Sequence, residues 1–324
     1  MQVHRDINSL PSFNKAVITI GTFDGVHTGH LQIINQLKKE ALEIGGETVI
    51  ITFHPHPRMV LRNKKIDSDN ESVKSIRLLS TLSEKIELLQ QQQIDHLVVV
   101  PFTQDFAEQS AEAYISNFLV SKFHPHTIII GYDHRFGKNR AGDYKLLEAY
   151  QANYQYKVKE IPEQVLHNVI ISSTRIRNAL SEGNVTEANE ALGYSYFFEG
   201  KVVEGNKLGR TIGYPTANIE INDDHKLIPA NGVYAVEVSL DRLAGEDAQH
   251  HNGMMNIGVR PTIGGTKQVI EVNIFDFEQS IYGGLIRVYV KNYLRPEVKF
   301  NGLDKLKAQL ADDKKDAIQI LNNG

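Results

Sequence analysis

The sequence predicts two domains of different fold class: an α/β domain over residues 1–184 and a β domain with a terminal helix over residues 185–324. Three observations lead to this prediction. A chain of 324 residues is long enough to bury two separate cores. In the first half, short apolar runs alternate with helical patterns, which is typical of a parallel sheet with crossover helices. After about Asn184 the chain becomes rich in strands and glycine, at the spacing of an antiparallel barrel or sandwich.

The elements of the first half are defined by their apolar patterns. The expected strands are Val17–Ile20, Thr48–Phe53, His96–Val100, Thr127–Ile130 and Tyr156–Ile161. The expected helices between them are His30–Ile44, Leu82–Gln92, Ser110–Lys122 and Asp143–Ala152. The charged segment Asp67–Val73 is expected to be a mobile loop. Ligands of parallel sheets bind beyond the carboxyl ends of the strands, so the polar motifs that follow the first four strands are expected to converge on one edge.

The elements of the second half are a short helix, six strands and a long helix. The strands are Phe197–Val203, Ala217–Ile221, Val233–Leu240, Gly253–Val259, Val269–Ile274 and Leu285–Leu294. Glu187–Leu192 is the short helix, and the polar stretch Asp241–Asn252 is expected to form a hairpin tip. In Gly302–Leu321, leucine and isoleucine recur at roughly helical spacing, which predicts a terminal helix that packs on the barrel.

Composition excludes several classes of function. The net charge is −4, so no overall basic field favours nucleic acid. Because the chain has no cysteine, disulfides, thiolate catalysis and cysteine-type metal sites are excluded. The polar segment 1–14 lacks the apolar stretch of a signal peptide, and no run approaches the roughly 18 apolar residues of a membrane span. We therefore expect a cytoplasmic protein without nucleic-acid or membrane partners.

The most informative motif is the ten-residue segment Gly21–His30, GTFDGVHTGH, which directly follows an apolar strand. It delivers His27 and His30 to the start of a helix, where free N–H groups favour anions. Two imidazoles there can hold a triphosphate and stabilise a pentacovalent phosphorus as pyrophosphate leaves. The alternative is a helix-capping turn with incidental histidines. The preceding strand and the glycine-bearing lead-in favour nucleotidyl transfer.

Three further motifs follow strands of the first half or open a helix. His54–Pro57 has a restricted backbone and predicts a rigid phosphate or flavin pocket, with zinc binding as a rival interpretation. In Gly131–Gly137, Asp133 can accept a hydrogen bond from a ribose hydroxyl or an adenine amino group, and Phe136 can stack on a ring. The alternative for that segment is an Asx-type turn with a buried Phe. Ile171–Arg177, ISSTRIR, is either a simple helix cap or a phosphate clamp in which Arg177 compensates developing charge.

In the second half, a glycine-dense segment and a strand glutamate carry the chemistry. The run Gly200–Asn218 lets the backbone approach phosphates, and its Thr216 and Asn218 are hard oxygen donors of the kind that Mg²⁺ accepts. Glu271 lies on an alternating strand, sharing one face with Asn273 and Phe275. A carboxylate in a pocket can take the proton of a primary alcohol that attacks a γ-phosphate. The alternatives are a glycine-rich turn and an exposed strand glutamate.

These motifs resemble the two modules of the bacterial bifunctional riboflavin kinase/FMN adenylyltransferase (FAD synthetase) family. Residues 16–177 are similar to its adenylyltransferase module through GTFDGVHTGH, the histidine–proline segment, Gly131–Gly137 and ISSTRIR. They depart from it at His134, where the family usually has Phe, and at His54, where it commonly has Asp or Glu. The second half is similar to the kinase module through GRTIGYPTAN, GVYA, MNIGVRPT and EVNIFDF, with Asn273 where the family often has His.

The resemblance implies a Rossmann-like nucleotidyltransferase sheet followed by an antiparallel barrel, and two consecutive reactions. Riboflavin is phosphorylated by ATP to FMN, and FMN is then adenylylated by a second ATP to FAD and pyrophosphate. The implied catalytic residues are Glu271 as general base of the kinase, and His27, His30 and Arg177 in the transferase. The implied ATP site of the transferase is Gly21, Phe23, Asp24, Gly29, Asp133, Ser172, Ser173 and Thr174, and the implied FMN pocket is His56, Pro57, Phe102 and Phe136. The implied kinase phosphate loop is Gly205, Gly209, Arg210 and Gly213, with Mg²⁺ on Thr216 and Asn218.

The implied partners are therefore small molecules, namely ATP, riboflavin, FMN and FAD. The implied oligomeric state is a monomer or a weak homo-oligomer. Two other interpretations remain open from the sequence. One is an enzyme with a single activity and one degenerate module, and the other is a flavin-binding regulator on an inherited scaffold. A related nucleotidyltransferase with another phosphorylated substrate is a weaker third interpretation, because it leaves the second half unexplained.

Overall fold

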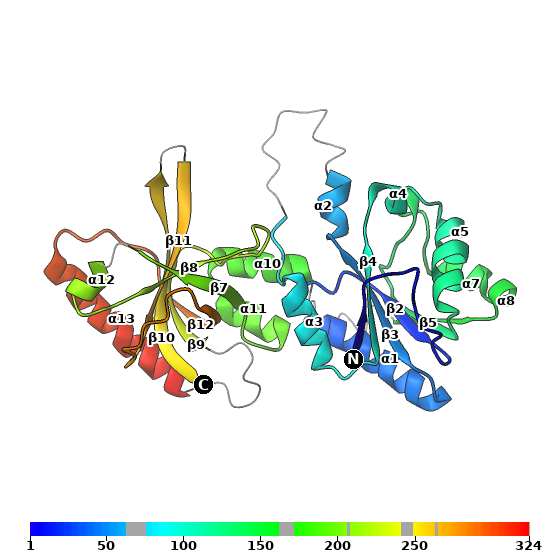
Figure 1. Cartoon of the computed structure of the whole chain (residues 1–324), viewed down its shortest axis with the longest axis horizontal. Coiled ribbons are helices and arrows are strands. Elements are labelled where there is room, and N and C mark those ends of the chain that lie inside the picture. The colour runs from blue at the N-terminus through cyan, green and yellow to red at the C-terminus, as the bar shows by residue number, and fades with distance from the viewer. Residues whose placement is uncertain (63–75, 162–171, 206–207, 241–248, 263–264, 324) are drawn as a thin grey trace. The chain divides into compact units, whose positions relative to one another are not determined.

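The structure, a computed structural model, describes residues 1–62, 76–161, 172–205, 208–240, 249–262 and 265–323. These residues form two compact units, Met1–Ser173 and Thr174–Gly324. Figure 1 shows a layered sheet-and-helix arrangement in the first unit and crossing strands with a long helix in the second. The expected segment Asp67–Val73 lies outside the described residues, as does most of Asp241–Asn252.

The first unit is built on a parallel sheet of six strands in the order β1-β4-β3-β2-β5-β6. The strands are β1 Gln2–His4, β2 Val17–Ile20, β3 Thr48–His54, β4 His96–Pro101, β5 Thr127–Gly131 and β6 Lys157–Ile161. The central β2 pairs with β3 through Ile18↔Val49 and with β5 through Ile18↔Ile128. The predicted parallel sheet is confirmed. Because the chain leaves β2 toward β3 and later returns to β5, the carboxyl end of β2 lies where the strand order reverses.

Helices cover the faces of this sheet. They are α1 Thr28–Ile44, α2 Pro57–Arg62, α3 Leu82–Gln90, α4 Gln104–Ala107, α5 Ala111–Ala113, α6 Ser121–Phe123, α7 Tyr144–Ala149 and α8 Gln151–Tyr154, with a π-helix at Tyr114–Val120 and a 3₁₀ turn at Lys138–Arg140. α1 contacts β2, β3 and β5 and buries Ile34 and Leu37 against them. Phe118 and Phe123 pack with the strand residues Ile18 and Val49 in another apolar cluster. The buried, β-branched strands therefore supply the core that holds the strand ends in place.

The second unit is a closed antiparallel barrel in the order β10-β11-β8-β7-β12-β9, as the sequence predicts. Its strands are β7 Phe197–Val203, β8 Ala217–Glu220, β9 Gly232–Ser239, β10 His250–Thr262, β11 Gly265–Ile274 and β12 Leu285–Arg295. Its helices are α10 Ser173–Glu182, α11 Val185–Leu192, α12 Leu208–Thr211 and α13 Leu303–Asn323. The barrel interior is filled by side chains such as Tyr234, Val236 and Met255, each fully buried.

The predicted terminal helix α13 packs on the barrel. It contacts β9, β10 and β12, and its Ala317 is buried against Ala235, Met254 and Phe275. The remaining differences from the expected elements are local. The expected helix Ser110–Lys122 consists of α5, the π-helix and α6, and the expected helix at Asp143–Ala152 breaks at Tyr150 between α7 and α8.

Candidate functional sites

The turn after β2 is shaped by strained backbone and by a buried carboxylate. Phe23, Gly25 and Val26 all have positive φ angles, of 47°, 81° and 38°. Asp24 is buried, and its carboxylate accepts hydrogen bonds from the backbone N–H groups of Leu79 and Ser80, both at 3.1 Å. Gly25 donates its N–H to the Ser80 hydroxyl at 3.0 Å. The segment before α3 therefore holds the turn in a conformation that a free chain rarely adopts.

The two histidines of the motif are stacked at the start of α1. His27 is the N-cap residue, and its Nδ1 accepts a hydrogen bond from the backbone N–H of His30 at 3.3 Å. This bond leaves the ring proton of His27 on Nε2. The two ring centroids lie 3.7 Å apart with an interplanar angle of 17°. The helix N-terminus and the Nε2–H of His27 are donors of the kind that bind anions, and the binding of a triphosphate here stays a prediction.

Burial disfavours the charged form of His30. Desolvation holds its pKa well below the usual range for histidine, and the charges of His27 and Lys85 lower it further. Its Nδ1 is buried and has no hydrogen-bond partner among the described residues. Lys85 of α3 is also buried, and desolvation lowers its pKa to about 8 against the opposing effect of Asp24. Sequence reasoning missed Lys85, because a lysine in an amphipathic helix gives no signal of burial.

The hydroxyl motif begins at this same turn. Ser173 donates its hydroxyl hydrogen to the carbonyl oxygen of Asp24 at 3.1 Å. Ser172 is exposed, and Ile171 lies outside the described residues. Thr174 and Arg177 lie on α10, which packs within the second unit, where Ala230 donates its N–H to the Leu180 carbonyl at 3.0 Å. The structure thus brings Ser173 to the histidine turn and leaves the roles of Thr174 and Arg177 as predictions.

The remaining residues predicted for the first site follow β2, β3, β4 and β5. Gly21 donates its N–H to Ile51 at 3.0 Å, and Gly29 is buried in the first turn of α1. His56 is buried, and its Nδ1 accepts from the N–H of Arg58, while Pro57 begins α2. Phe102 is half-buried, edge-on to Phe53 at 5.4 Å.

Asp133 and Phe136, both in the loop after β5, have opposite environments. Asp133 is exposed, and it follows β5, the strand beside β2. Phe136 is buried in the core, where its ring stacks on Tyr114 at 5.0 Å. Between them, the Nε2 of His134 is buried without a partner among the described residues, and burial lowers its pKa to about 4. Asp133 is thus exposed on the surface in this conformation, whereas Phe136 is not.

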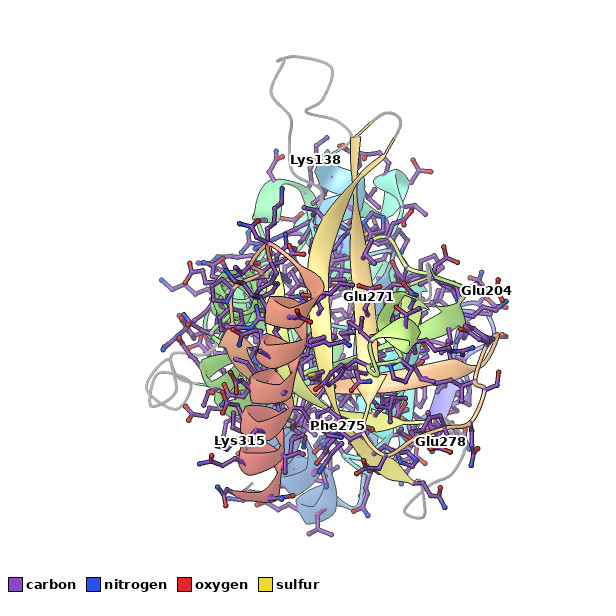
Figure 2. All side chains as sticks on the ribbon, turned by 90° about the vertical axis from the view of Figure 1, so that its left-hand side faces the viewer. Lys138, Glu204, Glu271, Phe275, Glu278 and Lys315 are labelled. Carbon is purple, nitrogen blue, oxygen red and sulfur yellow. The ribbon has the colours of Figure 1, made fainter. Side chains whose placement is uncertain are left out.

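The second site is a cavity of about 530 Å³ in the barrel unit. Its walls come from β9, β10, β11 and β12, from the segment after α12, and from the leucines Leu303, Leu306 and Leu310 of α13. Figure 2 shows Glu271 on the barrel strands, between α13 and α12 in that view. A mostly apolar cavity with a few convergent polar groups is typical of a site for a small aromatic ligand.

Part of the polar lining of the cavity lies on β11 and directly before β8. Glu271 of β11 lies directly opposite Asn218 of β8 in the strand register. Thr216, Glu271 and Asn273 line the cavity, and Glu271 and Asn273 share one face because side chains alternate along a strand. The predicted base is therefore adjacent to the predicted metal ligands. Among the described residues, no group of three or more His, Asp or Glu side chains is arranged to hold a metal.

The glycines of the kinase segment allow close approaches. A Cβ on Gly205 would lie 2.1 Å from the Nδ2 of Asn218, and one on Gly209 would lie 2.2 Å from the carbonyl oxygen of Tyr214. Gly213 adopts a φ of 85°, which favours glycine. Arg210 is exposed on α12. Gly209 borders the cavity, so the described part of this segment lies beside the predicted base.

An ion pair that sequence reasoning missed, between half-buried Arg295 and buried Asp313, lines the cavity. Arg295 of β12 donates from Nε and Nη2 to the two carboxylate oxygens of Asp313 on α13, both at 2.7 Å. Gln309 adds a hydrogen bond to Asp313 at 3.0 Å. Two parallel hydrogen bonds of this kind fix the relative orientation of the two side chains and also stabilise the pair. No local pattern marks Asp313, because it lies among the charged residues of an amphipathic helix.

The two folds and their sites together define an enzyme that combines a nucleotidyltransferase sheet with a phosphoryl-transferring barrel. Residues 10–175 match the family model of FAD synthetase, and residues 192–321 match that of riboflavin kinase. The chain is 40% identical over 301 residues to the bifunctional riboflavin kinase/FMN adenylyltransferase of Listeria monocytogenes, covering 93% of this chain and 90% of the relative. It is 35% identical to that of Escherichia coli, covering 97% and 96%.

A solved structure named macrolide-efflux protein from Streptococcus pneumoniae is similar over 97% of both chains, with a TM-score of 0.82 and 30% identity. The chain belongs to the bifunctional riboflavin kinase/FMN adenylyltransferase family. It is a riboflavin kinase and an FMN adenylyltransferase, with ATP and flavins as substrates. Within the described ranges, every helix is too short or too polar to cross a bilayer.

Proposed function

We propose that the barrel cavity performs the kinase step and that the turn after β2 performs the adenylyl transfer. The observation that carries this division is the pairing of Glu271 with Asn218 across two strands, with Thr216 lining the same cavity. It supports phosphoryl transfer in the barrel, while the histidine cap supports triphosphate binding in the sheet. We also propose a functional boundary between residues 184 and 185, so that α10 serves the transferase although it packs with the second unit.

In the kinase step, the Glu271 carboxylate accepts the proton of the riboflavin 5′-hydroxyl as that oxygen attacks the γ-phosphorus of ATP. The bond between the γ-phosphorus and the β,γ-bridging oxygen breaks, and ADP leaves. Gly205, Gly209, Arg210 and Gly213 form the loop over the phosphates in this proposal. The apolar side of the cavity, which includes Met254 and Leu306, accommodates the flavin ring.

The donor set around Glu271 fits Mg²⁺. The Thr216 hydroxyl and the Asn218 amide oxygen are hard ligands, and two protein ligands are enough for an ion that also keeps phosphate oxygens and water. When bound, Mg²⁺ neutralises charge on the transferring phosphates. The residues of the chain itself bring the hydroxyl acceptor and these ligands to adjacent strands. Because both reactions consume ATP, we propose a cytoplasmic location, and we propose a monomer or weak homo-oligomer.

In the transferase step, a phosphate oxygen of FMN attacks the α-phosphorus of the second ATP and pyrophosphate leaves. This phosphate is already a nucleophile, so catalysis consists of positioning and charge stabilisation. His27 donates from Nε2 to the triphosphate, and His30 supports it from the stacked position. Ser172, Ser173, Thr174 and Arg177 clamp the phosphates in this proposal.

The other transferase residues surround the nucleotide and the flavin in this proposal. Gly21, Phe23, Asp24 and Gly29 shape the ATP site, and Asp133 accepts from the ribose or the adenine. The carboxylate of Asp24 acts by organising the turn, because its oxygens are engaged with the backbone of Leu79 and Ser80. His56, Pro57 and Phe102 form the FMN pocket, with Phe136 supporting it from the core.

Chromatography of flavins after incubation with riboflavin, ATP and Mg²⁺ tests the assignment of the two sites. The wild-type chain should form FMN and then FAD. His27→Ala should abolish FAD formation while FMN accumulates, and Glu271→Gln should stop FMN formation while added FMN is still converted to FAD. Loss of both activities in either variant, with the chain still folded by circular dichroism, would refute the two-site assignment.

A further inference from the structure

Asn273 makes a short and buried contact with the segment that precedes the predicted metal ligands. Its Nδ2 donates a hydrogen bond to the carbonyl oxygen of Pro215 at 2.6 Å. The Asn273 side chain is buried, lines the cavity, and lies two residues after Glu271 on β11. Pro215 is the residue directly before Thr216. The amide of Asn273 therefore connects the strand of the base to the backbone beside the first metal ligand.

The strand ladder itself cannot make this connection. The pairing of β11 with β8 includes Glu271↔Asn218 and ends at Val272↔Ala217. One step further along, Thr216 and Pro215 continue the chain, but Pro215 has no N–H to donate to a ladder. Beyond this point the side-chain amide of Asn273 contacts the carbonyl oxygen of Pro215. This contact joins β11 directly to the residues that precede Ala217.

The same segment also contacts Gly209. Tyr214 donates its N–H to the Gly209 carbonyl at 2.9 Å. A Cβ added to Gly209 would lie 2.2 Å from the Tyr214 carbonyl oxygen and 3.6 Å from the Thr216 hydroxyl. The segment Tyr214–Thr216 is thus held between the backbone of Gly209 and the amide of Asn273. These two contacts restrain the backbone that carries the Thr216 hydroxyl.

We propose that Asn273 is a positioning residue of the kinase site: its amide holds Pro215 so that Thr216 presents its hydroxyl to the Mg²⁺–phosphate group of the nucleotide. The proposal rests on the proposed role of Thr216. In this proposal Asn273 acts on the nucleotide through Thr216 and has no role in binding the flavin. Its removal should therefore weaken the binding of a magnesium nucleotide and leave riboflavin binding unchanged.

Titration calorimetry of Mg²⁺–ADP and fluorescence titration of riboflavin without nucleotide separate these two effects on the full chain. Asn273→Leu has nearly the same shape but no donor, and it should raise the Kd for Mg²⁺–ADP about tenfold, as expected for one lost buried hydrogen bond. Asn273→His should retain most of the affinity, because its Nδ1–H takes the position of the amide nitrogen. Gln268→Leu removes an exposed amide from the same strand and should leave both Kd values unchanged.

A double-mutant cycle with Thr216→Val distinguishes the positioning role from the metal role. The losses of Asn273→Leu and Thr216→Val should be far from additive, because both act on one hydroxyl. If Thr216→Val leaves Mg²⁺–ADP binding intact, the proposed metal role of Thr216 fails, and the positioning role fails with it. If Thr216→Val weakens binding but Asn273→Leu does not, only the positioning role is overturned.

Three further outcomes would also overturn the positioning role. Full additivity of the two losses would show that Asn273 and Thr216 act independently. A selective loss of riboflavin binding in Asn273→Leu would mean that Asn273 contacts the flavin instead. If Asn273→Leu fails to fold, the comparison of Asn273→His with Asn273→Ser decides, since both keep a polar side chain and histidine retains the δ-position donor. Equal Mg²⁺–ADP affinity in these two variants would refute the role.

Discussion

Replacement of Asp24 by asparagine should destabilise the first unit selectively. Asp24 lies in the turn between β2 and α1 and is buried. Its carboxylate accepts from two backbone N–H groups, those of Leu79 and Ser80, at 3.1 Å each. Asparagine has the same shape, but it offers one acceptor where the turn needs two, and it places an N–H₂ group against an N–H donor. It also removes the negative charge that favours the protonated form of the buried Lys85.

The expected loss of stability is about 3 kcal/mol. One charge-assisted hydrogen bond contributes about 1.5–3 kcal/mol. Removing one partner of a buried charge pair costs about 3–5 kcal/mol when the other charge stays buried. Lys85 is 6% exposed, but burial already lowers its pKa to about 8, so the lysine can lose its proton and relieve part of that cost. For a unit of this size, 3 kcal/mol corresponds to a fall in midpoint temperature of about 6–12 °C.

Residual activities after heating provide the assay, because each activity reports on one unit. Asp24→Asn should lose FMN adenylylation at a temperature lower by that amount, while riboflavin phosphorylation is lost at the wild-type temperature. Asp105→Asn is the matched control, since Asp105 is exposed in the first turn of α4 and should change stability by less than about 0.5 kcal/mol. A wild-type inactivation temperature for Asp24→Asn, or a parallel loss of both activities, would refute the reasoning.

Three further substitutions test other contacts. Burial lowers the pKa of His134 to about 4, so neutral His134 makes its full contribution to the stability of the first unit above pH 6.5, and this contribution is lost as the pH falls from about 6.5 to about 4. His134→Phe should flatten this pH dependence, measured as thermal inactivation of FAD synthesis. The substitution should also raise the free energy of unfolding by about 1–3 kcal/mol near pH 5. Asp313→Asn should destabilise the barrel unit by about 3 kcal/mol, measured as earlier thermal loss of kinase activity, because Arg295 keeps its charge without its buried carboxylate. Gly205→Ala should reduce the kinase rate at least tenfold and spare FMN adenylylation, since the added Cβ would lie 2.1 Å from the Asn218 amide, and an unchanged kinase rate would contradict that contact.

Local patterns were sufficient for most of the fold. The predicted strands Val17–Ile20 and Phe197–Val203 coincide with β2 and β7, because their continuous or alternating apolar residues are typical of a strand. β1 could not be predicted in this way. Gln2–His4 is short and mainly polar, and it forms a strand only because β4 offers it an edge through Val3↔Leu97. Its formation depends on tertiary pairing rather than on its own residues.

For the sites, the sequence indicates which residue types carry the chemistry but not what supports them. The histidine motif and Glu271 can be found from their spacing and their neighbouring glycines. The partners of Asp24 are 55 and 56 positions away, and the contact between Asn273 and Pro215 spans 58 positions. Asn273 could be predicted to share a face with Glu271, but its hydrogen bond depends on a proline in the segment before β8. Contacts between residues so far apart in the sequence depend on how the whole backbone folds, so local motifs do not reveal them.

The ring of barrel strands also dictates the order in which the chain can finish folding during synthesis. β12 pairs with both β7 and β9, so the barrel cannot close until this last strand has been synthesised. Until Arg295 has left the ribosome, β7 and β9 present unpaired edges that invite association with other chains. The described strands of the first unit end by Ile161, so that unit can complete its sheet earlier. Nascent chains that stall before β12 should therefore be the species that need chaperones, while a finished barrel has no open edge to protect.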